Sequence, residues 1–226
     1  MAILHFQDMS KWEILRLRKQ HLAIFCLFAF IAFFLSCSDK EIDPQVREFE
    51  RLSEEGAFEA ANELGREILN RNINQGRTAF VMSDNFLNLE LEDSSFHYLN
   101  IALEFEPEWA ELHNNRGLIF QHRDEHEAAM LDFNRSIELD STFPYSYNNR
   151  GYSKMLMGEF KEGMKDVLKS EELDDNNAYV YRNKAIFYEK TGKLANACKW
   201  IQQAYGKRFY DQIESQIEFI ELRVCK

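Results

Sequence analysis

The pattern of apolar and polar positions near the end of the chain is that of an α-helix. Apolar residues stand four, three and four positions apart at Ile213, Ile217, Ile220 and Val224, and Glu214, Gln216, Glu218 and Glu221 fall on the other faces. This spacing places a single apolar edge on a helix. We therefore predict an amphipathic helix within residues 212–226 that caps the preceding part of the chain. A partner-binding helix is the alternative interpretation.

Upstream, sequence strings return at a period of 34 residues. Two of them are nearly identical: Asn114-Asn115-Arg116-Gly117 and Asn148-Asn149-Arg150-Gly151. Ala185 lies another 34 positions beyond Gly151. Extended in both directions, this register divides the chain into five units without insertions: 42–75, 76–109, 110–143, 144–177 and 178–211.

Positions that were not used to set this register support it. Twelve residues after the glycine position, every unit has a small residue: Ala61, Ser95, Ala129, Gly163 and Ala197. Four residues further on, most units have a bulky apolar one: Gly65, Leu99, Phe133, Val167 and Ile201. Small residues let two helices approach closely, and large side chains then fill the space between neighbouring pairs. The first unit departs from the pattern at Phe49 and Gly65, so it is the weakest match.

The pattern resembles the tetratricopeptide repeat, a 34-residue helix–turn–helix unit with small residues at its eighth and twentieth positions and a bulky one at its twenty-fourth. The resemblance covers residues 42–211. It implies an all-α fold, a right-handed α-solenoid of about five helix pairs with 212–226 as a C-terminal capping helix. Gly56, Gly158 and Gly192 fall between the two helices of their units, where a helix end favours a left-handed residue.

By this resemblance, the first helices of the units line a concave groove that binds a protein or peptide partner. The expected groove residues are Asn114, Asn115, Asn148, Asn149, Tyr152, Tyr179, Arg182 and Asn183. Asn115, Asn149 and Asn183 recur at one repeat position, and their amides can pair with the backbone of an extended peptide. Alternatively, these asparagines recur because the repeats share ancestry, or because they cap local backbone.

The first 37 residues have the features of a secretion signal. A basic region that includes Lys11 and Arg16 precedes an apolar run at 22–35, which is shorter than the ~20 residues that a spanning helix needs. Phe34-Leu35-Ser36-Cys37 resembles the bacterial lipobox, whose cysteine is lipid-modified. We therefore expect 1–36 to be a lipoprotein signal peptide, Cys37 to be lipidated and 37–42 to be a tether. An uncleaved signal anchor is the alternative.

Cysteine and histidine positions raise two further questions. An oxidising compartment would permit a disulfide between Cys198 and Cys225. Two widely spaced cysteines are not a disulfide framework, however, so we favour two partly buried thiols. His122 and His126 are four residues apart, but they fall across the expected turn between two helices. We therefore favour packing and solvation of these histidines over a metal site.

Composition and motifs favour a binding protein. The formal net charge of −11 makes nucleic acid an improbable partner. The sequence has no glycine-rich phosphate loop and no nucleophile elbow, so we expect neither an enzyme nor a cofactor. We predict a scaffold that is anchored to a membrane of the bacterial cell envelope. We expect it at the outer membrane, where it is either periplasmic or surface-exposed. The alternatives are a structural subunit of an outer-membrane assembly complex and a glycan-binding accessory lipoprotein.

Overall fold

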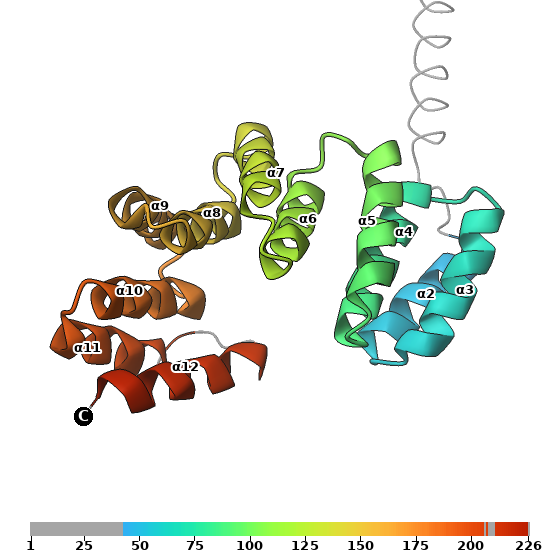
Figure 1. Ribbon diagram of the computed structural model, residues 1–226. Helices are drawn as coiled ribbons and strands as arrows, with labels where there is room; N and C mark the ends of the chain where they lie inside the picture. Colours follow the sequence, from blue (N-terminus) through green and yellow to red (C-terminus); the bar gives the residue numbers. More distant parts are fainter. Residues whose placement is uncertain (1–42, 206, 208–210, 226) are drawn as a thin grey trace, which may run out of the picture. The chain divides into compact units, whose positions relative to one another are not determined.

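The structure is a computed structural model that describes residues 43–205, 207 and 211–225, without the side chains of 211–215. The expected signal peptide, Cys37 and the tether lie outside the described residues. Within the described ranges the protein forms eleven α-helices and no strand (Figure 1). None of these helices is both long and apolar enough to cross a membrane. Their bounds are α2 Pro44–Glu54, α3 Phe58–Asn70, α4 Gln75–Asn88, α5 Glu92–Phe105, α6 Ala110–His122, α7 His126–Leu139, α8 Pro144–Leu156, α9 Phe160–Leu173, α10 Ala178–Lys190, α11 Leu194–Ala204 and α12 Asp211–Val224.

Consecutive helices pair into the hairpins α4–α5, α6–α7, α8–α9 and α10–α11, and α12 packs on the last of them. The helices α2 and α3 form a first hairpin, in which Phe49 of α2 lies beside Gly65 of α3. The predicted all-α solenoid of five helix pairs with a terminal helix is therefore confirmed. Each hairpin turns through a residue with positive φ, and these five residues are 34 positions apart. They are Gly56 (78°), Glu90 (59°), Asp124 (58°), Gly158 (86°) and Gly192 (75°).

The small residues of the repeat lie where the two helices of a hairpin touch. Ala129, Gly163 and Ala197 are each the fourth residue of their helix, α7, α9 and α11, and all are buried. In the fourth hairpin the backbones themselves approach closely, since a Cβ added to Gly163 would lie 2.5 Å from the carbonyl oxygen of Gly151. The helices can pack this closely only because neither position has a side chain.

The departures at Phe49 and Gly65 compensate each other. In the third hairpin, a Cβ on Gly117 would lie 2.7 Å from the ring of Phe133, so a small residue of the first helix faces a bulky residue of the second. In the first hairpin, a Cβ on Gly65 would lie 3.0 Å from the ring of Phe49, so the sizes are reversed. Phe49 is 1% exposed and Phe133 is 0% exposed, so both rings are core residues.

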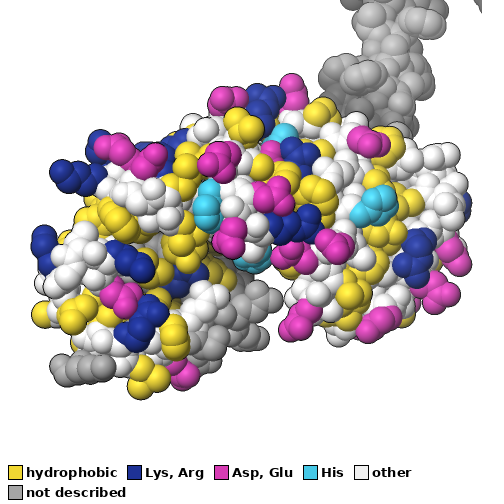
Figure 2. Space-filling view, in the orientation of Figure 1, with side chains coloured by type: hydrophobic (Ala, Val, Ile, Leu, Met, Phe, Trp, Pro, Cys, Tyr) yellow, Lys and Arg dark blue, Asp and Glu magenta, His cyan; other side chains and the backbone are white. Residues whose placement is uncertain are grey.

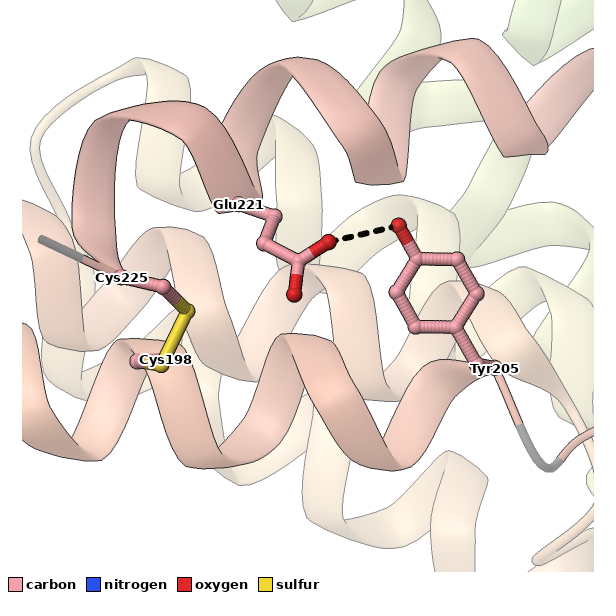
Figure 3. The surroundings of a disulfide bond; sticks show 4 residues. All are labelled: Cys198, Tyr205, Glu221 and Cys225. Carbon is pink, nitrogen blue, oxygen red and sulfur yellow. Dashed lines mark hydrogen bonds between the residues drawn. A yellow bond between two sulfur atoms is a disulfide. The ribbon is translucent and has the colours of Figure 1, made fainter.

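The terminal helix α12 is a cap held by apolar packing and by a disulfide. Ile217, Ile220 and Val224 are buried, as the apolar stripe predicted, whereas the side chain of Ile213 lies outside the described residues. Cys225 follows α12 and is bonded to Cys198 of α11, with 5.0 Å between their Cα atoms (Figure 3).

This disulfide corrects our preference for two free thiols. The spacing of the cysteines gave no sign that the end of the cap returns to the middle of α11. The hydroxyl of Tyr205 also donates to Glu221 at 2.8 Å, which adds a polar contact between the α11 end and the cap.

Candidate partner-binding groove

A groove with a volume of about 770 Å3 runs along the first helices of hairpins two to five and reaches α12. Its apolar lining is largely aromatic and aliphatic, with Leu87, Leu118, Phe143, Tyr145, Tyr152 and Tyr179. On the face shown in Figure 2, acidic and basic side chains lie interspersed over the surface. The groove itself combines this apolar contact area with numerous polar and charged side chains, so a ligand could make both apolar contacts and hydrogen bonds there.

Six of the eight predicted groove residues line this groove: Asn114, Asn115, Asn149, Tyr152, Tyr179 and Arg182. The other two lie beneath it, since Asn148 is 1% exposed and Asn183 is 0% exposed. The three asparagines that recur at one repeat position therefore differ in accessibility. Asn115 and Asn149 can reach a ligand, and Asn183 cannot.

The asparagine side chains form a head-to-tail series of hydrogen bonds. Nδ2 of Asn114 donates to Oδ1 of Asn115 at 3.1 Å, and Nδ2 of Asn149 donates to Oδ1 of Asn114 at 3.0 Å. Nδ2 of Asn148 donates to Oδ1 of Asn149 at 3.3 Å, and Nδ2 of Asn183 donates to Oδ1 of Asn148 at 2.9 Å. Every amide except the terminal Asn115 both donates and accepts, so this amide series joins α6, α8 and α10 and fixes their alignment.

Arg182 ends the amide series in a buried position. Arg182 is only 8% exposed, and burial lowers the pKa of its guanidinium. Nε and Nη2 donate to Oδ1 of Asn183 at 3.0 and 2.8 Å, and Nη1 donates to Oε1 of Gln216 on α12 at 2.5 Å. The rings of Tyr152 and Tyr179 lie 4.6 and 5.3 Å from the guanidinium carbon, within cation–π range.

The other end of the groove is acidic. Asp84 of α4 and Glu111 of α6 both line it. Burial and the negative charge of Glu111 raise the pKa of Asp84 to about 7, against the attraction of Arg77. Burial also raises the pKa of Glu111, again opposed by Arg77. The groove thus has carboxyl groups at its α4–α6 end and a guanidinium at its α10–α12 end.

A repeated arginine contact lies between neighbouring hairpins, and reasoning from the sequence missed it. Arg116 donates to Asp132 at 2.8 Å through both Nε and Nη2, and its Nη1 donates to Oδ1 of Asn100 at 3.0 Å. Burial raises the pKa of Asp132, but the hydrogen bonds from Arg116 and His113 outweigh this and lower it. The same contacts recur 34 residues on, among Asn134, Arg150 and Asp166. The sequence contained a signal for this contact, because its three residue types recur 34 positions apart, at Asn100 and Asn134, Arg116 and Arg150, and Asp132 and Asp166.

The two histidines that suggested a metal site lie at the turn between α6 and α7. The side chain of His122 is 60% exposed, with Nδ1 3.4 Å from Glu92. Nε2 of His126 lies 3.9 Å from Asp124. Within the described part of the protein, no cluster of three His, Cys, Asp or Glu side chains is placed to hold a metal ion.

Comparison with known families identifies one unit of the array. Residues 110–143, which contain α6 and α7, match the family model of the tetratricopeptide repeat. A search of curated proteins gave no match.

Solved structures share the fold over most of the chain. The crystal structure of MamA is 20% identical, with a TM-score of 0.60, over 70% of this chain and 92% of MamA. PilW, described as a widely conserved type IV pilus biogenesis factor, is 16% identical, with a TM-score of 0.65, over 75% of this chain and 78% of PilW. YrrB, described as a TPR protein with an unusual peptide-binding site, is 14% identical, with a TM-score of 0.60, over 85% of this chain and 95% of YrrB. Residues 110–143 are therefore a tetratricopeptide repeat, and the array to which they belong has the tetratricopeptide-repeat fold.

Proposed function

We propose that the protein is a membrane-anchored scaffold of the bacterial cell envelope that holds a segment of a partner protein in the groove. The observation that carries this proposal is the groove itself, about 770 Å3 in volume and lined by side chains from six helices. Tyr145, Tyr152 and Tyr179 supply large contact areas that lose little conformational entropy on binding. Binding by shape and hydrogen bonding involves no covalent step.

The groove also offers hydrogen bonds to a peptide backbone. Asn115 lines the groove, and its Oδ1 accepts from Asn114. Within the described residues, its Nδ2 has no hydrogen-bond partner, so this amide is available to a ligand carbonyl group. The other amides of the series, including that of Asn149, are bonded to one another, so we assign ligand contact to Asn115 and alignment of the repeats to Asn148, Asn149 and Asn183.

Two structural neighbours support this type of function. YrrB is described as having a peptide-binding site, and PilW is described as a pilus biogenesis factor. Tetratricopeptide-repeat proteins in general bind protein or peptide partners, which agrees with the lining of this groove. The likeness supports the role of a scaffold and leaves the partner to experiment.

The envelope location rests on two independent features. The basic region, the apolar run and Ser36-Cys37 are typical of a lipoprotein signal. The Cys198–Cys225 disulfide is typical of proteins that fold in an oxidising compartment such as the bacterial periplasm. A cytosolic scaffold would need neither feature.

The groove is tested by comparing two matched double variants of the full-length protein in pulldowns from solubilised membranes. Leu118→Asp with Tyr145→Ala alters the groove. Leu131→Asp with Leu168→Ala alters exposed positions on α7 and α9, where the residues are 72% and 48% exposed. We expect the groove variant to recover at least ten-fold less partner and the control variant to recover it normally. Equal recovery by both variants would move the binding site elsewhere.

The anchor is tested by Cys37→Ser and by globomycin, which blocks lipoprotein processing. We expect both treatments to leave the unprocessed, larger form of the protein, visible as a shift in gel mobility. The anchor proposal fails if metabolic labelling with a radioactive fatty acid gives the same signal for the wild type and for Cys37→Ser.

A structural subunit of an assembly complex is the second candidate, and α12 supports it. Phe219 and Leu222 are 60% and 75% exposed on the outer side of this cap. Apolar side chains exposed together on a terminal helix are a typical protein contact. If Phe219→Ser with Leu222→Ser abolishes partner recovery while the Leu118 and Tyr145 variant does not, this second function replaces the first.

A further inference from the structure

One part of the groove reaches deeper into the array than the rest. Most of the groove lining comes from the first helices of the hairpins, but Ser95 and Leu99 of α5 also line it. These two residues are 2% and 1% exposed. Among the second helices that the structure describes, α5 alone contributes to the groove. The groove therefore has a side pocket, which comprises Asp84 and Leu87 of α4, Ser95 and Leu99 of α5, and Glu111 of α6.

The side pocket contains a hydroxyl group that the protein leaves without a hydrogen bond. Ser95 is a buried residue, yet its Oγ has no hydrogen-bond partner among the described residues. A buried polar group without a partner is destabilising. Ser170 also lacks a partner, but it does not line the groove. The Ser95 hydroxyl is therefore positioned to bond with a ligand.

The two carboxyl groups of the side pocket are only partly compensated by the protein. Burial raises the pKa of both Asp84 and Glu111, and the attraction of Arg77 does not offset it. Arg77 also serves another carboxylate, since its Nε lies 3.6 Å from Oε1 of Glu50, and its side chain is 55% exposed. A raised carboxyl pKa means that the charged form lacks stabilising partners. A further cation between Asp84 and Glu111 would supply them.

Apolar side chains around these polar groups favour a long cation over a small ion. Leu87 and Leu99 belong to the side pocket, and Leu118 and Ile119 of α6 also line the groove. Lysine and arginine carry a cationic head on an aliphatic stem, so they can fill apolar space and reach a carboxylate at once. The amino terminus of a peptide has no such stem.

We propose that the side pocket accepts a lysine or arginine side chain of the groove-bound segment. The stem packs against Leu87 and Leu99, and the head donates hydrogen bonds to Asp84, Glu111 and the Ser95 hydroxyl. The inference rests on the proposed function, because the side pocket is a branch of the groove. It adds the chemical class of one partner residue and places that residue at the α4–α6 end.

The inference is tested with the detergent-solubilised full-length protein and three pools of random ten-residue peptides that end in an amide. The first pool is N-acetylated and contains Lys and Arg. The second is N-acetylated and lacks them, and the third lacks them but has a free amino terminus. We expect the first pool to be retained about ten-fold better than either of the others.

Each other outcome of this experiment contradicts a different statement. If the second pool is retained as well as the first, the inference fails and the proposed function survives. If the third pool equals the first, the site takes an amino terminus and the proposed side chain is wrong. If no pool is retained, the proposed function fails and this inference with it.

Matched variants separate the side pocket from the general attraction of an acidic protein for basic peptides. Asp84→Asn with Glu111→Gln removes the two carboxylates of the side pocket. Glu104→Gln with Glu127→Gln removes the same charge at exposed positions of α5 and α7. For the retained basic peptides we expect about ten-fold weaker binding to the first variant and unchanged binding to the second. Equal affinities for the two variants would overturn the proposal.

Ser95→Ala tests the place of the cation, because it removes the hydroxyl and adds no volume. We expect about three-fold weaker binding of the basic peptides. The same peptides with norleucine in place of the basic residue keep the stem and lose the charge, and we expect their affinity to stay unchanged. An equal change for both kinds of peptide, or no change for either, would place the cation outside the side pocket.

Discussion

The first and third hairpins solve the same packing problem with the sizes of their residues exchanged. In the third, the ring of Phe133 on the second helix fills the space over Gly117 on the first. In the first, the ring of Phe49 on the first helix and the side chain of Met82 on α4 fill the space over Gly65 on the second. One large and one small residue therefore meet at this contact in both hairpins, and the large side chain can come from either helix.

A second difference separates the hairpins before α6 from those after it. The amide series joins α6, α8 and α10 through Asn114, Asn149 and Asn183. At the corresponding positions α4 has Phe80 and Val81, and the ring of Phe80 packs 4.7 Å from that of Trp109. Amides need defined partners, whereas apolar contacts tolerate shifts. We therefore expect the later hairpins to be aligned more strictly.

The largest effect should come from deleting the two rings. Phe49→Ala and Phe133→Ala should each lower the free energy of unfolding by about 3–5 kcal/mol, because each leaves a cavity in a fully buried contact. Urea unfolding followed by circular dichroism measures both. A loss below about 1 kcal/mol for Phe49→Ala would show that the first hairpin does not depend on the exchanged pair.

Removing the disulfide should affect only the C-terminal region. The bond closes a loop with a sequence separation of 27 residues. Cys198→Ser with Cys225→Ser should therefore cost about 3 kcal/mol in the entropy-based account. Because each repeat contacts only its neighbours, hydrogen exchange should accelerate in α11 and α12 and stay unchanged in α4 and α5. Uniform acceleration over the whole array would contradict this local effect.

Alanine at two different glycines should distinguish the two kinds of contact. A Cβ on Gly151 would meet the backbone oxygen of Gly163 at 2.7 Å, which cannot move without shifting a helix. We expect Gly151→Ala to cost about 1–3 kcal/mol. A Cβ on Gly65 would meet the flexible side chain of Met82 at 2.7 Å and the ring of Phe49 at 3.0 Å, and no backbone atom, so Gly65→Ala should cost less than Gly151→Ala. Thermal melts of both variants measure this, and equal losses would remove the distinction.

The smallest expected effect is a gain in stability, whereas the preceding substitutions should lower it. The pKa of Asp84 rises from 3.8 to about 7, so the folded state binds more protons than the unfolded state between these values. Stability should therefore fall as the pH rises through this range. Asp84→Asn should gain about 1–2 kcal/mol at pH 8 and nothing at pH 3.

Glu218→Gln, at an exposed position of α12, is the control for Asp84→Asn. Thermal melts at pH 3 and pH 8 measure both variants. The same gain at both pH values would show that burial of the Asp84 carboxylate is not the cause.

The sequence predicted the array well because its signal is repeated. Ala129, Gly163 and Ala197 mark the same position in three helices, and a period tested at several positions rarely arises by chance. The exchanged pair was read as a weakness, because Phe49 and Gly65 each break the pattern when they are considered alone. Their compensation becomes visible only when the two helices are placed side by side.

The groove was less predictable than the fold. Repeat position predicted that Asn115, Asn149 and Asn183 all face the groove. Asn115 and Asn149 line it, whereas Asn183 is 0% exposed and its amide is bonded to Arg182 and Asn148. The disulfide and the Arg182–Gln216 contact both depend on where α12 returns along α10 and α11. No period describes that return, since the cap occurs once.

Photo-cross-linking in living cells tests the central claim, that the groove holds a partner protein. A photoreactive amino acid would be placed at Leu118 in the groove or at Leu131, which is 72% exposed on α7, and adducts would be identified by mass spectrometry. The account predicts adducts with a defined envelope protein from position 118 and none with that protein from position 131. Adducts from position 131 alone would contradict it.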